Sequence, residues 1–179
     1  MACVAGTDEA GRGPLAGAVY AAAVILSAPI DGLNDSKKLT AKRRESLYDE
    51  ILANAVAYGI ATASAAEIDA VNILQASQLA MNRAIERLGI VPELVLVDGS
   101  FNQSINYPSI AIIKGDGEFQ CIAAASILAK VARDRYMAEL AELYPQYAFE
   151  KHKGYGTKLH YERLREFGPC PEHRRTFLH

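Results

Sequence analysis

The amino-acid sequence predicts an α/β fold in which a central mixed β-sheet is flanked by helices. Three observations support this prediction. Two strand-like segments open the chain on either side of a turn, strand-like and helix-like segments then alternate, and several strand-like segments run into acidic residues. The chain has 179 residues, half of them hydrophobic, so it can bury the core of a single domain, 1–179.

The first elements are expected to be a hairpin, a helix and a third strand. A short apolar run ends at Asp8-Glu9, and Pro14 with two glycines opposes regular structure just after it. Thr40 can cap the N-terminus of a helix. The expected elements are a strand at 4–7, a turn at 11–14, a strand at 19–26, a loop at 31–36, a helix at 40–54 and a strand at 56–62.

Helices and strands are expected to alternate in the rest of the chain. Ser64 and Glu67 form a capping-box pattern before apolar residues at helical spacing, which continue until Gly89. Apolar residues in steps of three or four predict a long helix that Pro145 ends. The expected elements are a helical region at 64–88, strands at 94–97 and 110–113, a long helix at 122–143 and a last helix at 157–167.

Acidic residues at the ends of three expected strands are the main functional observation. They are Asp8-Glu9, Asp98 and Asp116, and open α/β sheets bind ligands at strand ends. Gathered carboxylates raise one another's pKa unless a cation is present. Oxygen ligands without His or Cys favour Mg²⁺ or Mn²⁺ over Zn²⁺, and two such ions can hydrolyse a phosphodiester. Any one acid alone is better interpreted as a cap or turn residue; the set of four predicts a metal site.

A nucleotide-binding α/β protein is an alternative, because Gly11, Gly13 and Ala16 fit a degenerate dinucleotide fingerprint with Asp31 about 20 residues further on. Asp8-Glu9 would repel the pyrophosphate, however, and the proline after Gly13 removes a backbone donor. The next segment also has strand character, whereas the fingerprint needs the N-terminus of a helix. We therefore favour a turn whose glycines let the backbone approach a sugar or phosphate.

Further polar residues could contact an anionic substrate. They are Lys37 and Lys38 in a loop, Ser126, Lys130 and Arg133 at i, i+4 and i+7 on the long helix, and Lys153 and Tyr155 in the segment 152–157. For the helix, a solvent-exposed face and a contact with the substrate or with the acids are equally good interpretations. An exposed tyrosine can stack on a base or sugar, although a lone tyrosine is more often packed.

Charge is distributed unevenly along the chain. Residues 151–179 contain seven Lys/Arg and three acids, although the whole chain has a net charge of −2. A basic C-terminal segment, about 145–179, beside an acidic body suits a protein that binds a polyanion at one place and cations at another. On charge alone, a solvated basic helix is the simpler interpretation.

Taken together, these segments resemble the type 2 ribonuclease H family, the bacterial ribonuclease HII proteins. The match extends over nearly the whole chain in order, with no departure at the motif positions. The matching segments are 8–17 (DEAGRGPLAG), 34–39 (NDSKKL), 97–99 (VDG), 114–116 (KGD), 123–134 (AAASILAKVARD) and 152–157 (HKGYGT).

The resemblance implies a ribonuclease H-like fold with a small helical C-terminal part, and an endonuclease that depends on Mg²⁺ or Mn²⁺. Its substrates would be RNA–DNA hybrids and DNA duplexes that contain ribonucleotides, cut on the 5′ side of a ribonucleotide to leave 5′-phosphate and 3′-hydroxyl ends, as in ribonucleotide removal from DNA. The implied site residues are Asp8, Glu9, Asp98 and Asp116 for metal and catalysis, Gly11, Arg12 and Gly13 for the ribose 2′-hydroxyl, and Tyr155 for substrate sensing. Asp134 also matches, but we do not expect it in the metal site.

A non-catalytic nucleic-acid binding module, whose acids only cap helices and turns, is the other alternative. The longest apolar stretch, 15–26, is shorter than the roughly 20 residues of a membrane helix, and the N-terminus lacks the basic region of a signal peptide. Cys3, Cys121 and Cys170 lack metal-binding spacing and are expected to be reduced. We therefore expect a cytoplasmic monomer.

Overall fold

A single mixed sheet forms the centre of the molecule in the computed structural model, which describes residues 3–34 and 36–179. Its strand order is β3-β2-β1-β4-β5. The β1–β2 and β2–β3 pairs are antiparallel, whereas β1–β4 and β4–β5 are parallel, as the predicted mixed sheet requires. The strands are β1 (Val4–Ala10), β2 (Val19–Ile25), β3 (Ala57–Ala63), β4 (Leu94–Asp98) and β5 (Ser109–Ile112).

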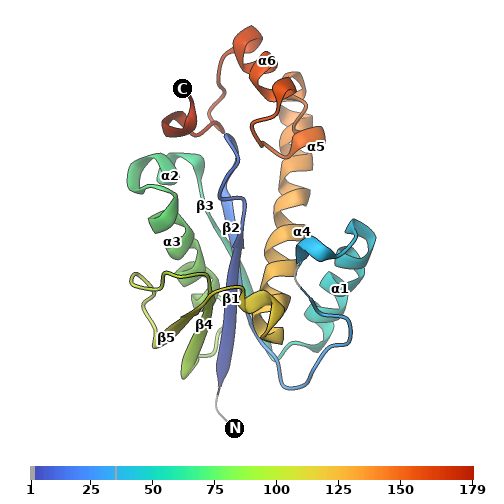
Figure 1. The fold of residues 1–179 in the computed structure, drawn as a ribbon, viewed down its shortest axis with the longest axis vertical. Coiled ribbons are helices and arrows are strands. Elements are labelled where there is room, and N and C mark those ends of the chain that lie inside the picture. The colour runs from blue at the N-terminus through green and yellow to red at the C-terminus, as the bar shows by residue number, and fades with distance from the viewer. Residues whose placement is uncertain (1–2, 35) are drawn as a thin grey trace.

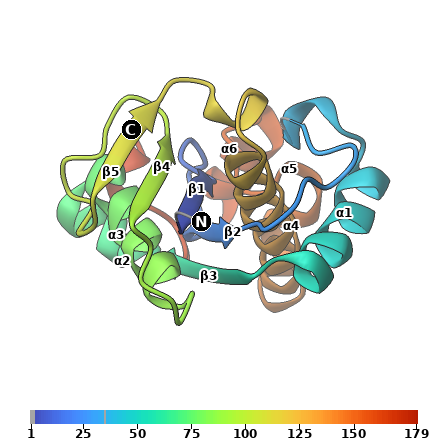
Figure 2. The same ribbon diagram turned by 90° about the horizontal axis from the view of Figure 1, so that it is seen from below.

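Helices cover both faces of this sheet, and a small helical part lies beyond its end. The α-helices are α1 (Ala41–Asn54), α2 (Ala65–Val71), α3 (Ile73–Glu86), α4 (Gln120–Leu143), α5 (Phe149–His152) and α6 (Lys158–Phe167). Short 3-10 helices are η1 (Ser36–Lys38), η2 (Gly115–Gly117), η3 (Pro145–Tyr147) and η4 (Arg175–Phe177). Figures 1 and 2 show α2 and α3 on one face, α4 and α1 on the other, and α5 and α6 near the C-terminal end of α4.

The predicted helix starts are confirmed at three caps. The hydroxyls of Thr40 and Thr157 accept the backbone N–H of Arg43 and His160. Ser64 and Glu67 form a complete capping box. These starts are local, since each needs a side chain and a backbone group only three residues apart.

The expected end of the first strand is wrong. β1 does not end at Asp8-Glu9 but continues to Ala10, because Ala10 still pairs with β2. The helical region expected at 64–88 consists of two helices, because Asn72 has φ 74° and separates α2 from α3. Its side chain accepts the N–H of Gln75, so it caps the second helix. Asp35, part of the expected loop at 31–36, lies outside the described residues.

Two further expectations concern redox state and membranes. Cys3, Cys121 and Cys170 are all free thiols in the described part of the chain, as expected. Within residues 3–34 and 36–179, no helix combines the length and the apolar character needed to cross a membrane.

Gly6 brings β1 against α4 with backbone touching backbone. A Cβ at Gly6 would lie 2.4 Å from the backbone carbon of Cys121 and 2.4 Å from the nitrogen of Ile122. Ile122 and most of the α4 residues that follow it, up to Val131, are buried. Gly6 therefore sets the distance between α4 and β1, the strand that carries Asp8 and Glu9.

We predict that Gly6→Ala lowers the free energy of unfolding by about 1–3 kcal/mol or more, because overpacking against backbone cannot be relieved by a rotamer change. Thermal and urea unfolding followed by circular dichroism measure this. Gly117→Ala is the matched control, since no described atom lies within 4 Å of a Cβ there. Equal stability of Gly6→Ala and the control would contradict the proposed close contact.

Candidate active site

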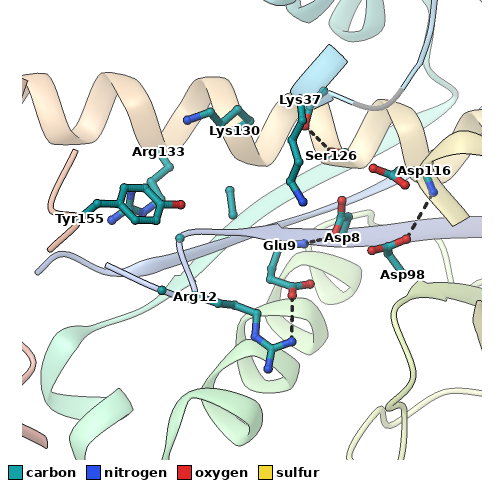
Figure 3. A pocket seen from close by; sticks show the side chains of 14 residues that line it. Asp8, Glu9, Arg12, Lys37, Asp98, Asp116, Ser126, Lys130, Arg133 and Tyr155 are labelled. Carbon is teal, nitrogen blue, oxygen red and sulfur yellow. Dashed lines mark hydrogen bonds and ion pairs between the residues drawn. The ribbon is translucent and has the colours of Figure 1, made fainter. Parts of the chain in front are cut away.

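The four predicted acids come together at one end of the sheet. β1 and β4 are parallel and paired up to the residues before Asp8 and Asp98, so these two acids lie on neighbouring strands. After β5 the chain turns back through η2, where the N–H of Asp116 donates to Oδ1 of Asp98 at 3.3 Å. Glu9 follows Asp8 on β1, and its N–H donates to Oδ1 of Asp8 at 2.7 Å. Figure 3 shows these side chains around one pocket.

Asp8 and Glu9 point to opposite faces of the sheet, as consecutive strand residues do. Asp8 lies on the α4 side, where the Ser126 hydroxyl lowers the pKa of Asp8 against the larger effect of burial. Glu9 also lines a cavity on the α3 side and lies 3.5 Å from Arg12. In this arrangement no three His, Cys, Asp or Glu side chains of the described chain form a ready ion site.

Burial and mutual repulsion disfavour the charged forms of the two acids on β1. Burial raises the pKa of Asp8 well above its usual value, and the charges of Glu9 and Asp98 raise it further. Burial also raises the pKa of Glu9, against the opposing effect of Arg12. When these acids are ionised together they repel one another, and a bound cation would relieve that cost.

The oxygen donors of this site fit a hard divalent cation. Within the described chain, Oε2 of Glu9 is buried and has no hydrogen-bond partner. A buried carboxylate oxygen without a partner is costly, and a cation would satisfy it while relieving the repulsion at Asp8. Carboxylates alone are the donor set that Mg²⁺ and Mn²⁺ accept.

The pocket has a volume of about 340 Å³, which admits a small part of a polymer. Two residues predicted to contact substrate, Lys38 and Lys153, do not line it. The lining residues are Asp8, Glu9, Ala10, Gly11, Arg12, Gly13, Ser36, Lys37, Asp98, Asp116, Ser126, Lys130, Arg133 and Tyr155.

The polar residues of α4 have separate partners. The Ser126 hydroxyl lies 2.8 Å from that of Ser36, which connects η1 to the helix beside Asp8. Lys130 forms an ion pair of 2.8 Å with Asp134 and also lines the pocket. Asp134 itself does not line the pocket.

Arg133 does not lie on a solvent-exposed face, as one interpretation expected, and it lines the same pocket as the acids. Its side chain is buried and donates to the carbonyls of Ala16 and Ala18 and to that of Lys153, at 3.1–3.2 Å. A Cβ at Gly11 would lie 1.9 Å from Nε of Arg133, and Gly11 has φ 90°. Gly11 is therefore required by its backbone conformation and by Arg133.

Arg174 holds the same turn from the other side and was missed in the sequence. It is fully buried and donates to the carbonyls of Gly11, Arg12 and Gly17 at 2.5, 2.7 and 2.9 Å. Burial, together with the charge of Arg133, lowers the pKa of Arg174 to about 9, which still leaves a cation at neutral pH. No local pattern marks Arg174, because its partners are backbone groups far away in the chain.

Tyr155 reaches the pocket from the C-terminal part. Its side chain is 45% exposed and lies opposite the turn, with its ring 3.6 Å from where a Cβ at Gly13 would be. The segment before it docks on the residues after the turn, since the Leu15 N–H donates to the Gly154 carbonyl. The turn and Tyr155 therefore form one wall of the pocket.

The dinucleotide-binding alternative does not fit this geometry. The residues after the glycine turn enter the strand β2, so no helix N-terminus faces the turn. The carbonyls of Gly11 and Arg12 are occupied by Arg174, and Asp8 and Glu9 lie where a pyrophosphate would bind.

Comparison with known proteins gives a consistent result. The model of the family "Ribonuclease HII" matches residues 5–179. A ribonuclease HII from Bordetella avium is 61% identical over 176 residues, which are 97% of this chain and 87% of that protein. The fold is similar to ribonuclease H2 from Pyrococcus horikoshii OT3 (TM-score 0.79, 29% identity, 97% of this chain and 92% of that one). It is also similar to the ribonuclease HII of Archaeoglobus fulgidus in a complex with PCNA (TM-score 0.81, 28% identity, 96% and 93%).

We predict that Asp98→Asn raises the melting temperature of the metal-free protein by about 2–4 °C at pH 8, the shift that roughly 1 kcal/mol gives in a domain of this size. The charge of Asp98 raises the pKa of Asp8 and Glu9. Raised folded-state pKa values cost stability as pH rises through them, so removing this charge helps at pH 8. The gain should largely disappear at about pH 3, below the ordinary pKa values of 3.8 and 4.5, where most of these acids are protonated in both states.

Differential scanning fluorimetry in EDTA and in Mg²⁺ measures this effect. Asp134→Asn is the control, because it also removes one carboxylate, but that carboxylate pairs with Lys130 and lies outside the cluster of four acids. Mg²⁺ should stabilise the unmodified protein more than Asp98→Asn. A gain that is undiminished at about pH 3, or that Asp134→Asn reproduces, would show that repulsion within the cluster is not its cause.

Proposed function

The chain belongs to the ribonuclease HII family, and we propose that its carboxylate pocket hydrolyses the RNA strand of RNA–DNA hybrids and cuts on the 5′ side of single ribonucleotides embedded in duplex DNA. Membership of the family makes the chain a ribonuclease H endonuclease, so neither the nucleotide-binding nor the non-catalytic alternative is favoured. One observation supports the pocket as the site: Asp8, Glu9, Asp98 and Asp116 line a single cavity together with the glycine turn.

Asp8, Glu9, Asp98 and Asp116 would hold Mg²⁺ or Mn²⁺. When bound, such ions supply Lewis acidity, which activates a water and stabilises charge on the phosphodiester. The carboxylates of the chain would fix the ion positions and can accept a proton from the attacking water. Lys37 and Lys130, which line the same pocket, would bring positive charge to the phosphate.

Selection of RNA needs a group that detects the 2′-hydroxyl, which both donates and accepts hydrogen bonds. The turn Gly11-Arg12-Gly13 follows Asp8 and Glu9 almost directly. On the pocket side of Gly13, Tyr155 is the only residue of the described chain that a Cβ would approach within 4 Å. Arg174 donates to the carbonyls of Gly11 and Arg12, while Arg133 packs against Gly11 and donates to the carbonyls of Ala16 and Ala18 after the turn. The turn would therefore bind the ribonucleotide, and the ring of Tyr155 would pack against the neighbouring sugar.

The basic segment 145–179 would bind the duplex outside the pocket, as part of a single domain 1–179. Lys151 is exposed and Lys153 half-buried, and neither lines the pocket, so both suit contacts with the phosphate backbone. The three free cysteines suit a reducing compartment such as the cytoplasm. The partner class is thus nucleic acid, bound electrostatically.

We predict that Asp98→Asn and Asp116→Asn each reduce cleavage by about 10²–10³-fold or more, the usual cost of removing one electrostatic group from an active site. The assay uses a labelled duplex with one ribonucleotide, in saturating Mg²⁺ and in EDTA, and maps the cut. The unmodified protein should cut on the 5′ side of the ribonucleotide only when metal is present. Near-normal cleavage by the correctly folded Asp98→Asn protein, or cleavage in EDTA, would exclude the proposed site.

We also predict that Tyr155→Ala reduces cleavage at a single embedded ribonucleotide more than cleavage within a long RNA–DNA hybrid. The ring can stack on a sugar or base, and stacking contributes about 1–3 kcal/mol, or about 5- to 150-fold. Both substrates are compared at equal salt and metal. Tyr155→Phe is the control, because it keeps the ring. Equal losses on the two substrates would give Tyr155 a general binding role instead.

A further inference from the structure

Three buried histidines lie behind Tyr155 in the C-terminal part. His152, His160 and His173 are 7%, 0% and 2% exposed. The rings of His152 and His160 are stacked, with centroids 4.4 Å apart, and Phe149 packs edge-on against both. Three imidazoles in an apolar cluster need satisfied hydrogen bonds, so the position of each proton can be deduced.

One assignment of protons satisfies a chain of bonds that ends at Tyr155. The Cys170 N–H donates to Nδ1 of His173 at 3.0 Å, so the proton of His173 is on Nε2. Nε2 of His173 lies 3.0 Å from Nε2 of His160, which must therefore accept. The proton of His160 is then on Nδ1, which donates to the Tyr155 carbonyl at 3.0 Å.

This chain works only while both rings are neutral. A second proton on His160 would place two N–H groups against each other, and one on His173 would oppose the Cys170 N–H. Burial lowers the pKa of both rings, that of His173 to about 4 with a contribution from His160. The two rings are therefore neutral around pH 7.

The backbone of Tyr155 determines where its ring lies. Its N–H donates to the His152 carbonyl at 2.9 Å, and its carbonyl also accepts the N–H of Thr157 at 2.8 Å. The bond from His160 connects this loop to the buried cluster and, through His173, to the segment after α6, whereas the bond from the Gly154 N–H to Nδ1 of His152 stays within the same segment. A loop held in this way keeps the exposed ring beside the glycine turn.

We propose that His160 and His173 are positioning residues, which orient Tyr155 for the junction between ribonucleotide and DNA. This inference rests on the proposed role of Tyr155. It assigns two residues that do not line the pocket to substrate discrimination, and it predicts that they act through Tyr155 and not through overall stability.

The test measures the ratio of cleavage at a single ribonucleotide to cleavage within a long hybrid, which is independent of the fraction of active enzyme. His160→Leu removes the donor to Tyr155 and should lower the ratio about 2- to 10-fold, the effect of one hydrogen bond. His160→Asn places an amide nitrogen near the position of Nδ1 and should largely restore it. All assays are run where circular dichroism shows a folded protein.

Tyr147→Phe is the matched control. It removes the 2.6 Å bond from the Tyr147 hydroxyl to the Gly168 carbonyl in the same part of the fold but leaves the histidine chain intact. It should lower the melting temperature without changing the ratio. If His160→Leu does not fold, His173→Asn replaces it, since an amide oxygen can still accept the Cys170 N–H while the donor to His160 is lost.

The double variant separates the two proposals. If His160 acts through Tyr155, adding His160→Leu to Tyr155→Ala should cause no further loss in the ratio. If the single variant Tyr155→Ala leaves the ratio unchanged, the proposed role of Tyr155 is overturned. Two results would overturn the positioning role alone. In the first, the ratio changes in Tyr155→Ala but not in His160→Leu or His173→Asn. In the second, Tyr147→Phe changes the ratio as much as His160→Leu does.

Discussion

The close approach of β1 to α4 is the constraint on which the site depends. Where Gly6 meets Cys121 and Ile122, strand and helix are in backbone contact, and they then run side by side. A strand rises about 3.3 Å per residue and a helix about 1.5 Å, so five strand residues span about the same length as eleven helical ones. Gly11 accordingly meets Arg133, as Gly6 meets Ile122. One glycine contact thus aligns the acids and the turn with the polar residues of the helix.

Opposite charges are separated along the pocket. At one end, buried carboxylates repel one another, which is unfavourable without a cation. At the other, two buried guanidiniums hold backbone carbonyls of the turn at residues 11–18. Arg174 does not line the pocket, so the positive charge that an anionic substrate would meet comes from Lys37 and Lys130, which do line it. This arrangement explains why a chain with net charge −2 can bind a polyanion at one place.

The parts of the structure that depend on neighbours in the sequence could be predicted, and those that depend on distant backbone groups could not. The caps at Thr40, Ser64 and Thr157 need partners three residues away. The acids could be grouped because strand ends share an edge of the sheet. The separation of Asp8 and Glu9 onto opposite faces was missed because β1 was expected to end there. Arg174 was missed because backbone carbonyls carry no sequence signature.

The anchoring of the glycine turn by Arg174 has a consequence for the order of assembly. The two groups joined are more than 160 residues apart in the chain. During synthesis from the N-terminus, β1 and all four acids leave the ribosome long before Arg174 does. A nascent chain can therefore gather its acids early, while the turn beside them stays without its anchor until Arg174 has been made. The first loop of the chain thus depends for its rigidity on a segment that is made more than 160 residues later.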